Sequence, residues 1–114
     1  MSLEYQSTLL SDIIVHTKYS KYLSKLSRRE TWEEVVARNA EMHMSHFPYI
    51  KQEIDDAYKY VYDKKVLPSL RSLQFAGKAI ELNPARIYNC SYAPVNDWKV
   101  FGEIMFLLLG GTGA

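Results

Sequence analysis

The single cysteine of this chain, Cys90, is the residue whose type most directly suggests chemistry. It lies in the stretch RIYNCSYAP, residues 86–94. A thiolate can act as a nucleophile, a metal ligand or one half of a disulfide. No CxxC pair or neighbouring histidine marks this thiol as activated. The local pattern therefore leaves two interpretations open, a reactive thiol and a buried structural cysteine.

Two other patterns contain residue types that occur in binding sites. His43 and His46 lie three residues apart, on one turn of a helix, but two nitrogen ligands are too few for a closed metal site. The run from Gly110 to Gly113 lacks the Lys-Ser/Thr of a P-loop and the spacing of a dinucleotide fingerprint. We therefore predict no metal site, and we interpret the glycine run by itself as a turn that ends a helix.

The composition limits the possible partners. The chain has 114 residues, 47% of them hydrophobic and 24% charged, and its net charge is +1. Nine tyrosines and two tryptophans could stack on bases, but no basic stripe accompanies them. One cysteine cannot form an intramolecular disulfide, and the N-terminus lacks the basic start and apolar core of a signal peptide. We expect a cytoplasmic protein that binds neither nucleic acid nor a membrane.

The first half of the chain predicts helices. Residues 1–30 have no clear period, and we interpret them as an irregular arm with one short helix around residues 9–15. Thr31 and Glu34 fit a capping box, and the helix that follows should end near Phe47, before Pro48. A second amphipathic helix is expected over residues 51–64.

The second half mixes helix and strand signals. A short helix should follow Pro68 and close at Gly77, and residues 87–93 are rich in tyrosine and isoleucine, as a strand should be. A last helix, residues 98–109, is apolar almost all round, so it must be covered on most sides. A chain of this length has too little other material to cover it, and we therefore expect an incomplete assembly.

The order of four elements resembles a known family. The stretch LPSLRSLQFAGKA, an Asn-Pro turn, RIYNCSYAPV and FGEIMFLLLGGTG together resemble the N-terminal portion of ribonucleotide reductase large subunits. The similarity covers residues 30–113 and is greatest to the adenosylcobalamin-dependent class and its phage-like relatives. The resemblance implies a mostly α chain with one or two strands: an arm (1–30), a helical region (31–82), and the first strand and helix of a ten-stranded α/β barrel (83–114).

The resemblance also implies roles for individual residues. Cys90 corresponds to a thiol that helps reduce the ribose and ends in a disulfide, and Asn89 to a polar contact with the ribose. Ser69 corresponds to a hydroxyl that contacts the substrate phosphates, and Gly111 and Gly113 to a glycine loop whose backbone approaches the substrate. The implied cofactor is adenosylcobalamin, bound mainly by the rest of the enzyme, and the implied reductant is an external dithiol such as thioredoxin.

The family's second redox cysteine and its radical-carrying cysteine have no counterpart in this sequence. We therefore expect the N-terminal piece of a split or intein-interrupted reductase, inactive until the C-terminal portion completes it. The alternative is a small helical protein-interaction module in which Cys90 is part of the core.

Overall fold

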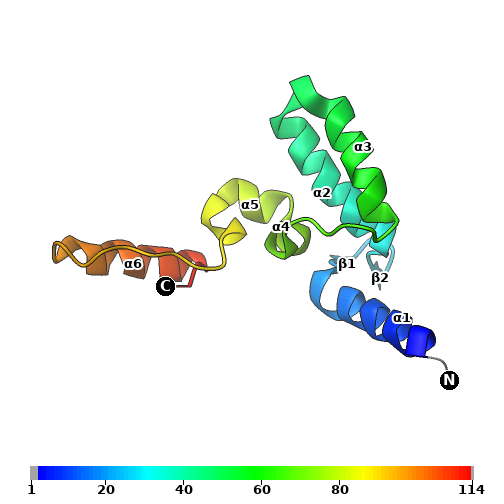
Figure 1. The fold of residues 1–114 in the computed structure, drawn as a ribbon, viewed down its shortest axis with the longest axis horizontal. Coiled ribbons are helices and arrows are strands. Elements are labelled where there is room, and N and C mark those ends of the chain that lie inside the picture. Colours follow the sequence, from blue (N-terminus) through cyan, green and yellow to red (C-terminus); the bar gives the residue numbers. More distant parts are fainter. Residues whose placement is uncertain (1–2, 114) are drawn as a thin grey trace. The chain divides into compact units, whose positions relative to one another are not determined.

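The computed structural model describes residues 3–113 and is mostly helical (Figure 1). The chain forms two compact units, Met1–Pro68 and Ser69–Ala114. The expectation of a mostly α chain with a small strand content is confirmed: among the described residues the only sheet has two short strands.

The first unit begins with helix α1 (Leu3–Ile14), which continues into a π-helical turn, Val15–Tyr19. The prediction of an irregular arm with a helix only around residues 9–15 was wrong. Tyr5, Leu9 and Ile13 follow one another at intervals of four residues, and this spacing forms one side of a helix. The sequence signal was weak because α1 has no buried residue.

Strands β1 (Tyr22–Leu23) and β2 (Arg28–Arg29) form an antiparallel hairpin that the sequence did not predict. The hairpin is fastened to the next helix by Glu30. Its carboxylate accepts hydrogen bonds from Nε and Nη2 of Arg38, each at 2.9 Å, and from the backbone N–H of Lys21 at 2.9 Å. The carboxylate of Glu30 and the guanidinium of Arg38 are largely buried. Such a pair keeps its geometry because separating it leaves a buried charge without a partner.

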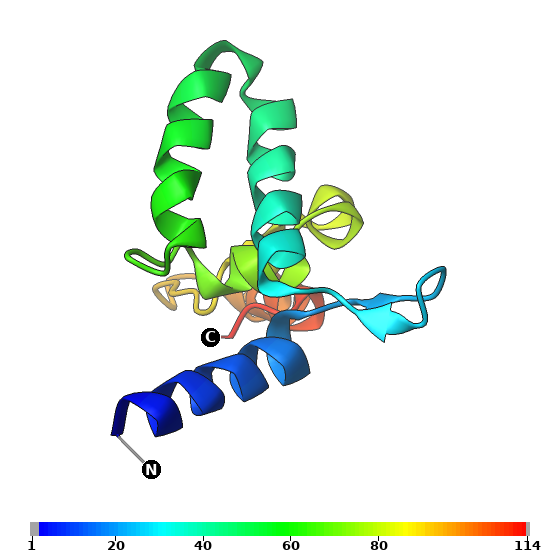
Figure 2. The same ribbon diagram turned by 90° about the vertical axis from the view of Figure 1, so that its right-hand side faces the viewer.

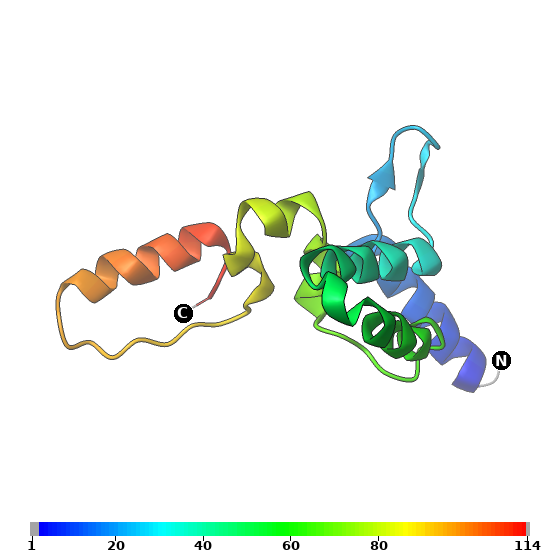
Figure 3. The ribbon, with the colours of Figure 1, turned by 90° about the horizontal axis from the view of Figure 1, so that it is seen from above.

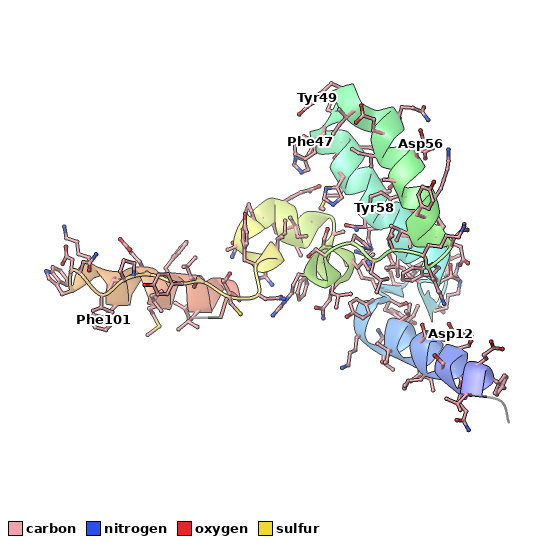
Figure 4. The ribbon with its side chains drawn as sticks, in the orientation of Figure 1. Asp12, Phe47, Tyr49, Asp56, Tyr58 and Phe101 are labelled. Carbon is pink, nitrogen blue, oxygen red and sulfur yellow. The ribbon has the colours of Figure 1, made fainter. Side chains whose placement is uncertain are left out.

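Helices α2 (Trp32–His46) and α3 (Lys51–Tyr62) are antiparallel neighbours, joined through the 3₁₀ turn Pro48–Ile50 (Figure 2). The predicted capping box is confirmed, because Thr31 accepts from the amide of Glu34 and the Glu34 carboxylate accepts from the amide of Thr31. At the turn between the helices, the rings of Phe47 and Tyr49 meet edge to face with centroids 6.3 Å apart (Figure 4).

The core of the first unit lies between these two helices and consists of Val36, Ala40, Tyr58 and Val61. The buried amide of Asn39 donates to the Tyr58 hydroxyl at 2.8 Å. Burial raises the pKa of Tyr58 to about 12, so this phenol stays protonated and neutral in the core.

The second unit contains α4 (Leu70–Phe75), α5 (Lys78–Leu82), the 3₁₀ turn Pro84–Ile87 and α6 (Lys99–Gly110). The expected short helix after Pro68 is α4. Gly77 follows it with a φ of +94°, a value that favours glycine, and the chain then starts a further helix, α5, that the sequence did not predict.

The predicted strand over residues 87–93 is not a full strand. Its only ladder contact among the described residues is one parallel bridge between Cys90 and Gly113. Figure 3 shows the segment that precedes α6 running along one side of this helix. The segment and the helix run in opposite directions. A strand needs a neighbour of similar length, and Gly113 supplies only one residue pair.

Helix α6 is apolar on nearly every side, as expected, and the second unit covers little of it. Val100 is its only buried residue, whereas Phe101 is 66% exposed and projects from the helix (Figure 4). The other large exposed apolar side chains of α6 are Met105, Phe106, Leu108 and Leu109. An exposed apolar area of this extent is typical of a surface that contacts another protein segment.

Candidate functional site

The predicted site residues Asn89, Cys90 and Gly113 lie together in the second unit. The backbone N–H of Gly113 donates to the carbonyl of Asn89 at 2.8 Å, and the N–H of Ser91 donates to the carbonyl of Gly113 at 2.6 Å. The Ser91 hydroxyl donates to the same carbonyl at 3.1 Å. Cys90 is thus held between two backbone hydrogen bonds, and its side chain is exposed. Within its unit the thiol is not a core residue.

Two positions of the run that ends α6 favour glycine. A Cβ atom on Gly113 would lie 3.0 Å from the Asn89 carbonyl oxygen, so the close backbone approach depends on the absence of a side chain. Gly111 has a φ of +97° and ends the helix in the left-handed conformation. The interpretation of this run as a helix-terminating turn is confirmed.

Thr112 is a buried residue of this site that the sequence analysis missed. Its hydroxyl donates to the carbonyl of Ala85 at 2.7 Å, and its N–H donates to the carbonyl of Leu107 at 2.9 Å. These contacts fix the turn after α6 against the turn that precedes the Cys90 segment. The sequence pattern pointed to Gly111 and Gly113, whereas Thr112 between them holds the turn in position.

Arg71 connects α4 to the same segment. Its Nε donates to the Asn89 side-chain oxygen at 2.7 Å, and its guanidinium lies over the Phe75 ring, 5.7 Å from the centroid. Arg71 was not among the residues predicted for the site, although it is the only charged residue between Val66 and Gly77. An isolated charge in an apolar helix was the signal that could have found it.

Ser69 is the N-cap residue of α4. Its hydroxyl accepts from the backbone N–H of Ser72 at 3.4 Å, a long contact that leaves the hydroxyl hydrogen available as a donor. The side chain is exposed. Arg71, two residues further along α4, makes the contact to Asn89 that ties this helix to the Cys90 segment.

A groove of about 500 Å³ lies between α6 and the segment that follows Cys90. It is lined almost entirely by apolar side chains. They come from Tyr92, Ala93 and Val95 on one side and from Val100, Phe101, Ile104, Met105 and Leu108 of α6 on the other, and Ser91 completes the lining. A groove with this lining can bind apolar groups.

His43 and His46, the pair weighed for a metal, lie in the last turn of α2. Burial lowers the pKa of His43, and repulsion from His46 lowers it further. The His43 ring is 6.2 Å from the Tyr58 ring, measured between centroids. Within residues 3–113, no three His, Cys, Asp or Glu side chains are grouped so that they could hold a metal ion.

Over the same described range, none of the helices combines the length and the hydropathy needed to cross a membrane. Comparison with known proteins adds no identification: no family model, no curated protein and no solved structure matches this chain.

Proposed function

We propose that this chain supplies one redox-active thiol and part of the substrate-binding surface of a ribonucleotide reductase, acting together with the rest of a ten-stranded α/β barrel. The parallel bridge between Cys90 and Gly113 is the observation that carries the proposal. The two bridged residues are connected through α6, and an extended segment, a helix and a parallel return form the repeating unit of α/β folds.

The proposed chemistry needs a thiol in a fixed position beside the sugar. Reduction of a ribonucleotide replaces the 2′-hydroxyl by hydrogen and releases water. The two electrons and two protons come from two thiols, which become one disulfide. Cys90 would be one of them, and the rest of the barrel would supply the other. The backbone hydrogen bonds on both sides of Cys90 support this proposal, because they hold the backbone that carries the thiol in place.

The substrate contacts that we propose are polar. Asn89, oriented by Arg71, would contact the ribose, and the Ser69 hydroxyl would donate to a phosphate oxygen. The backbone at Gly111 and Gly113 has no side chain to keep a substrate away. An external dithiol such as thioredoxin would reduce the disulfide after each turnover by thiol–disulfide exchange.

Adenosylcobalamin is the radical source that the family resemblance favours, and the described residues do not form a site for it. The groove beside α6 has only Ser91 and the Tyr92 hydroxyl as polar side-chain groups, whereas this cofactor carries many amide groups that need hydrogen-bond partners. We therefore assign no cofactor contact to this chain and propose that the rest of the enzyme binds it.

The test is reconstitution. The chain is produced together with the downstream portion of the reductase, and deoxyribonucleotide formation is measured with ribonucleoside di- and triphosphates, adenosylcobalamin and dithiothreitol. We expect turnover with the unmodified chain and its loss with Cys90→Ser, because a hydroxyl cannot form the disulfide. Tyr88→Phe, an exposed change two residues away, is the matched control and should retain turnover. Normal turnover by the serine variant would disprove the redox role.

A protein-interaction module is the second candidate, and the exposed apolar face of α6 favours it. The two candidate functions differ in which partner covers the exposed apolar side chains of α6. A free-standing module should stay monomeric, and the remainder of the barrel should not change its binding of apolar dye. A barrel fragment should bind dye strongly until the remainder of the barrel is added.

A further inference from the structure

We propose that the groove between α6 and residues 91–95 binds one further β-strand, which enters at Gly113 and runs parallel to residues 91–95. The assignment of this strand to the remainder of the catalytic barrel rests on the proposed function. The existence, direction and register of the binding site rest on the geometry of the second unit.

The direction follows from the hydrogen bonds at Gly113. Its N–H and C=O bond to Asn89 and Ser91, which is the pattern of a parallel ladder. Figure 3 shows the chain after α6 turning back towards the direction in which the segment after Cys90 runs. A strand that continued from Gly113 would therefore run alongside residues 91–95.

The register follows from the alternation of backbone groups along a strand. Asn89 and Ser91 face Gly113, so Ala93 faces the same edge. In the described part of the chain, neither the N–H of Ala93 nor the C=O of Ser91 has a hydrogen-bond partner. These two groups are the next donor and acceptor of the ladder, and a parallel strand would pair with both.

The opposite edge of the segment is less suited to pairing. It presents the backbone groups of Cys90, Tyr92 and Pro94, and Pro94 has no N–H to donate. The edge that faces Gly113 keeps all of its donors. The position of the proline therefore favours a partner on the side where the bridge already exists.

The lining of the groove defines the side chains of the strand. Ile104 and Met105 of α6 and Val95 of the segment offer apolar contacts, and Met105 and Val95 are exposed in the second unit. One face of the strand must pack on α6, so apolar side chains are required at alternate positions. A strand of this kind would extend the ladder and cover α6 at the same time.

The experiment adds such a strand to the full chain. A seven-residue extension of alternating valine and threonine is placed after Ala114, and amide hydrogen exchange is measured by NMR. We expect the Ala93 amide to exchange at least tenfold more slowly than in the unextended protein. In the matched control, a seven-residue extension of alternating glycine and serine has the same length but a low tendency to form a strand and no apolar side chains to pack on α6. This control should show no slowing.

A second variant tests the groove. Ile104→Asp in the extended protein places a carboxylate in the apolar lining and should restore fast exchange at Ala93. Equal exchange of the Ala93 amide in the valine–threonine and glycine–serine proteins would overturn the proposed strand site. Protection of Ala93 that increases with the concentration of the unextended chain would identify a second copy as the occupant and would also overturn the proposal. Because none of these measurements involves nucleotide reduction, a failure of the reconstitution alone would remove the proposed function and leave the strand site intact.

Discussion

Gly113 is the residue on which the geometry around Cys90 depends. A methyl group at this position would be 3.0 Å from the Asn89 carbonyl oxygen, and the backbone would have to move to accommodate it. We predict that Gly113→Ala weakens the bridge by about 1–3 kcal/mol, the usual cost of an added methyl group in a close contact. The Ser91 amide, which donates to Gly113, should then exchange about tenfold faster or more.

Gly102→Ala is the matched control for this change. Gly102 lies within α6, and a Cβ there would meet nothing within 4 Å. Alanine should therefore stabilise the helix by about 0.5–1 kcal/mol, because glycine loses more conformational freedom on folding. Faster exchange at Ser91 in this variant, or unchanged exchange in Gly113→Ala, would show that the close approach has no role.

The sequence singled out some of the residues at this site and missed others for a physical reason. Cys90 and the glycines attract attention by their type, whatever the fold. Arg71 and Thr112 act through partners that lie 18 and 27 residues away in the chain, Asn89 and Ala85. Contacts over such separations are set by the packing of α4 and of the turns, which no local pattern encodes.

At the scale of elements, the start of α2 has a pH dependence that can be measured. Hydrogen bonds from Arg28 and from the backbone of Thr31 lower the pKa of Glu34 to about 2 from its ordinary value of 4.5. Because the pKa of Glu34 is lower in the folded state than in the unfolded state, its ionised carboxylate stabilises the fold at pH values above about 4.5. This contribution is lost as the pH falls from about 4.5 towards 2. We predict that Glu34→Gln weakens this dependence, measured as the urea midpoint at pH 7 and at pH 3.

Glu33→Gln is the comparison for that prediction. Glu33 lies in the same first turn of α2 and is exposed, and among the described residues its side chain makes no hydrogen bond or ion pair. The Glu33→Gln variant should therefore change the difference between the urea midpoints at pH 7 and pH 3 much less than Glu34→Gln does. If both glutamine variants lost the dependence equally, the net charge of the turn would be responsible, and the capping box would not.

The elements that the sequence predicted well have strong local signals. Helices α2 and α3 have apolar residues at helical intervals and α2 has a capping box, and both begin close to where they were expected. The hairpin had no such signal, because its strands are two residues long and its anchor is the Glu30–Arg38 pair. The strand after residue 87 was predicted from its composition, but a ladder also requires a partner, and composition does not provide one.

At the scale of the whole molecule, the first unit has a core of its own. Val36, Ala40, Tyr58 and Val61 all belong to α2 and α3 and pack against one another. We predict that residues 1–68 produced alone retain the α2–α3 pair and unfold cooperatively. The check is NMR: the amide shifts of Val36 and Tyr58 should match those of the full chain.

Val61→Asp serves as the control in both proteins, because a carboxylate in this core should unfold the helix pair whether or not residues 69–114 are present. A fragment without helical circular dichroism, or with shifted Val36 and Tyr58 amides, would contradict the independence of the first unit. The sequence predicted helices α2 and α3 of this unit but neither the extent of α1 nor the unit boundary at Pro68, since no change in composition marks that boundary.

Pro94 also bears on aggregation. A segment with open backbone groups on both edges can be stacked into a fibril, because each added strand offers a new edge for the next one. Residues 91–95 have a full set of donors on one edge and a missing donor at Pro94 on the other. Incorrect association of this segment should therefore stop at small oligomers. The missing N–H of Pro94 prevents further strands from adding at the second edge while α6 stays exposed.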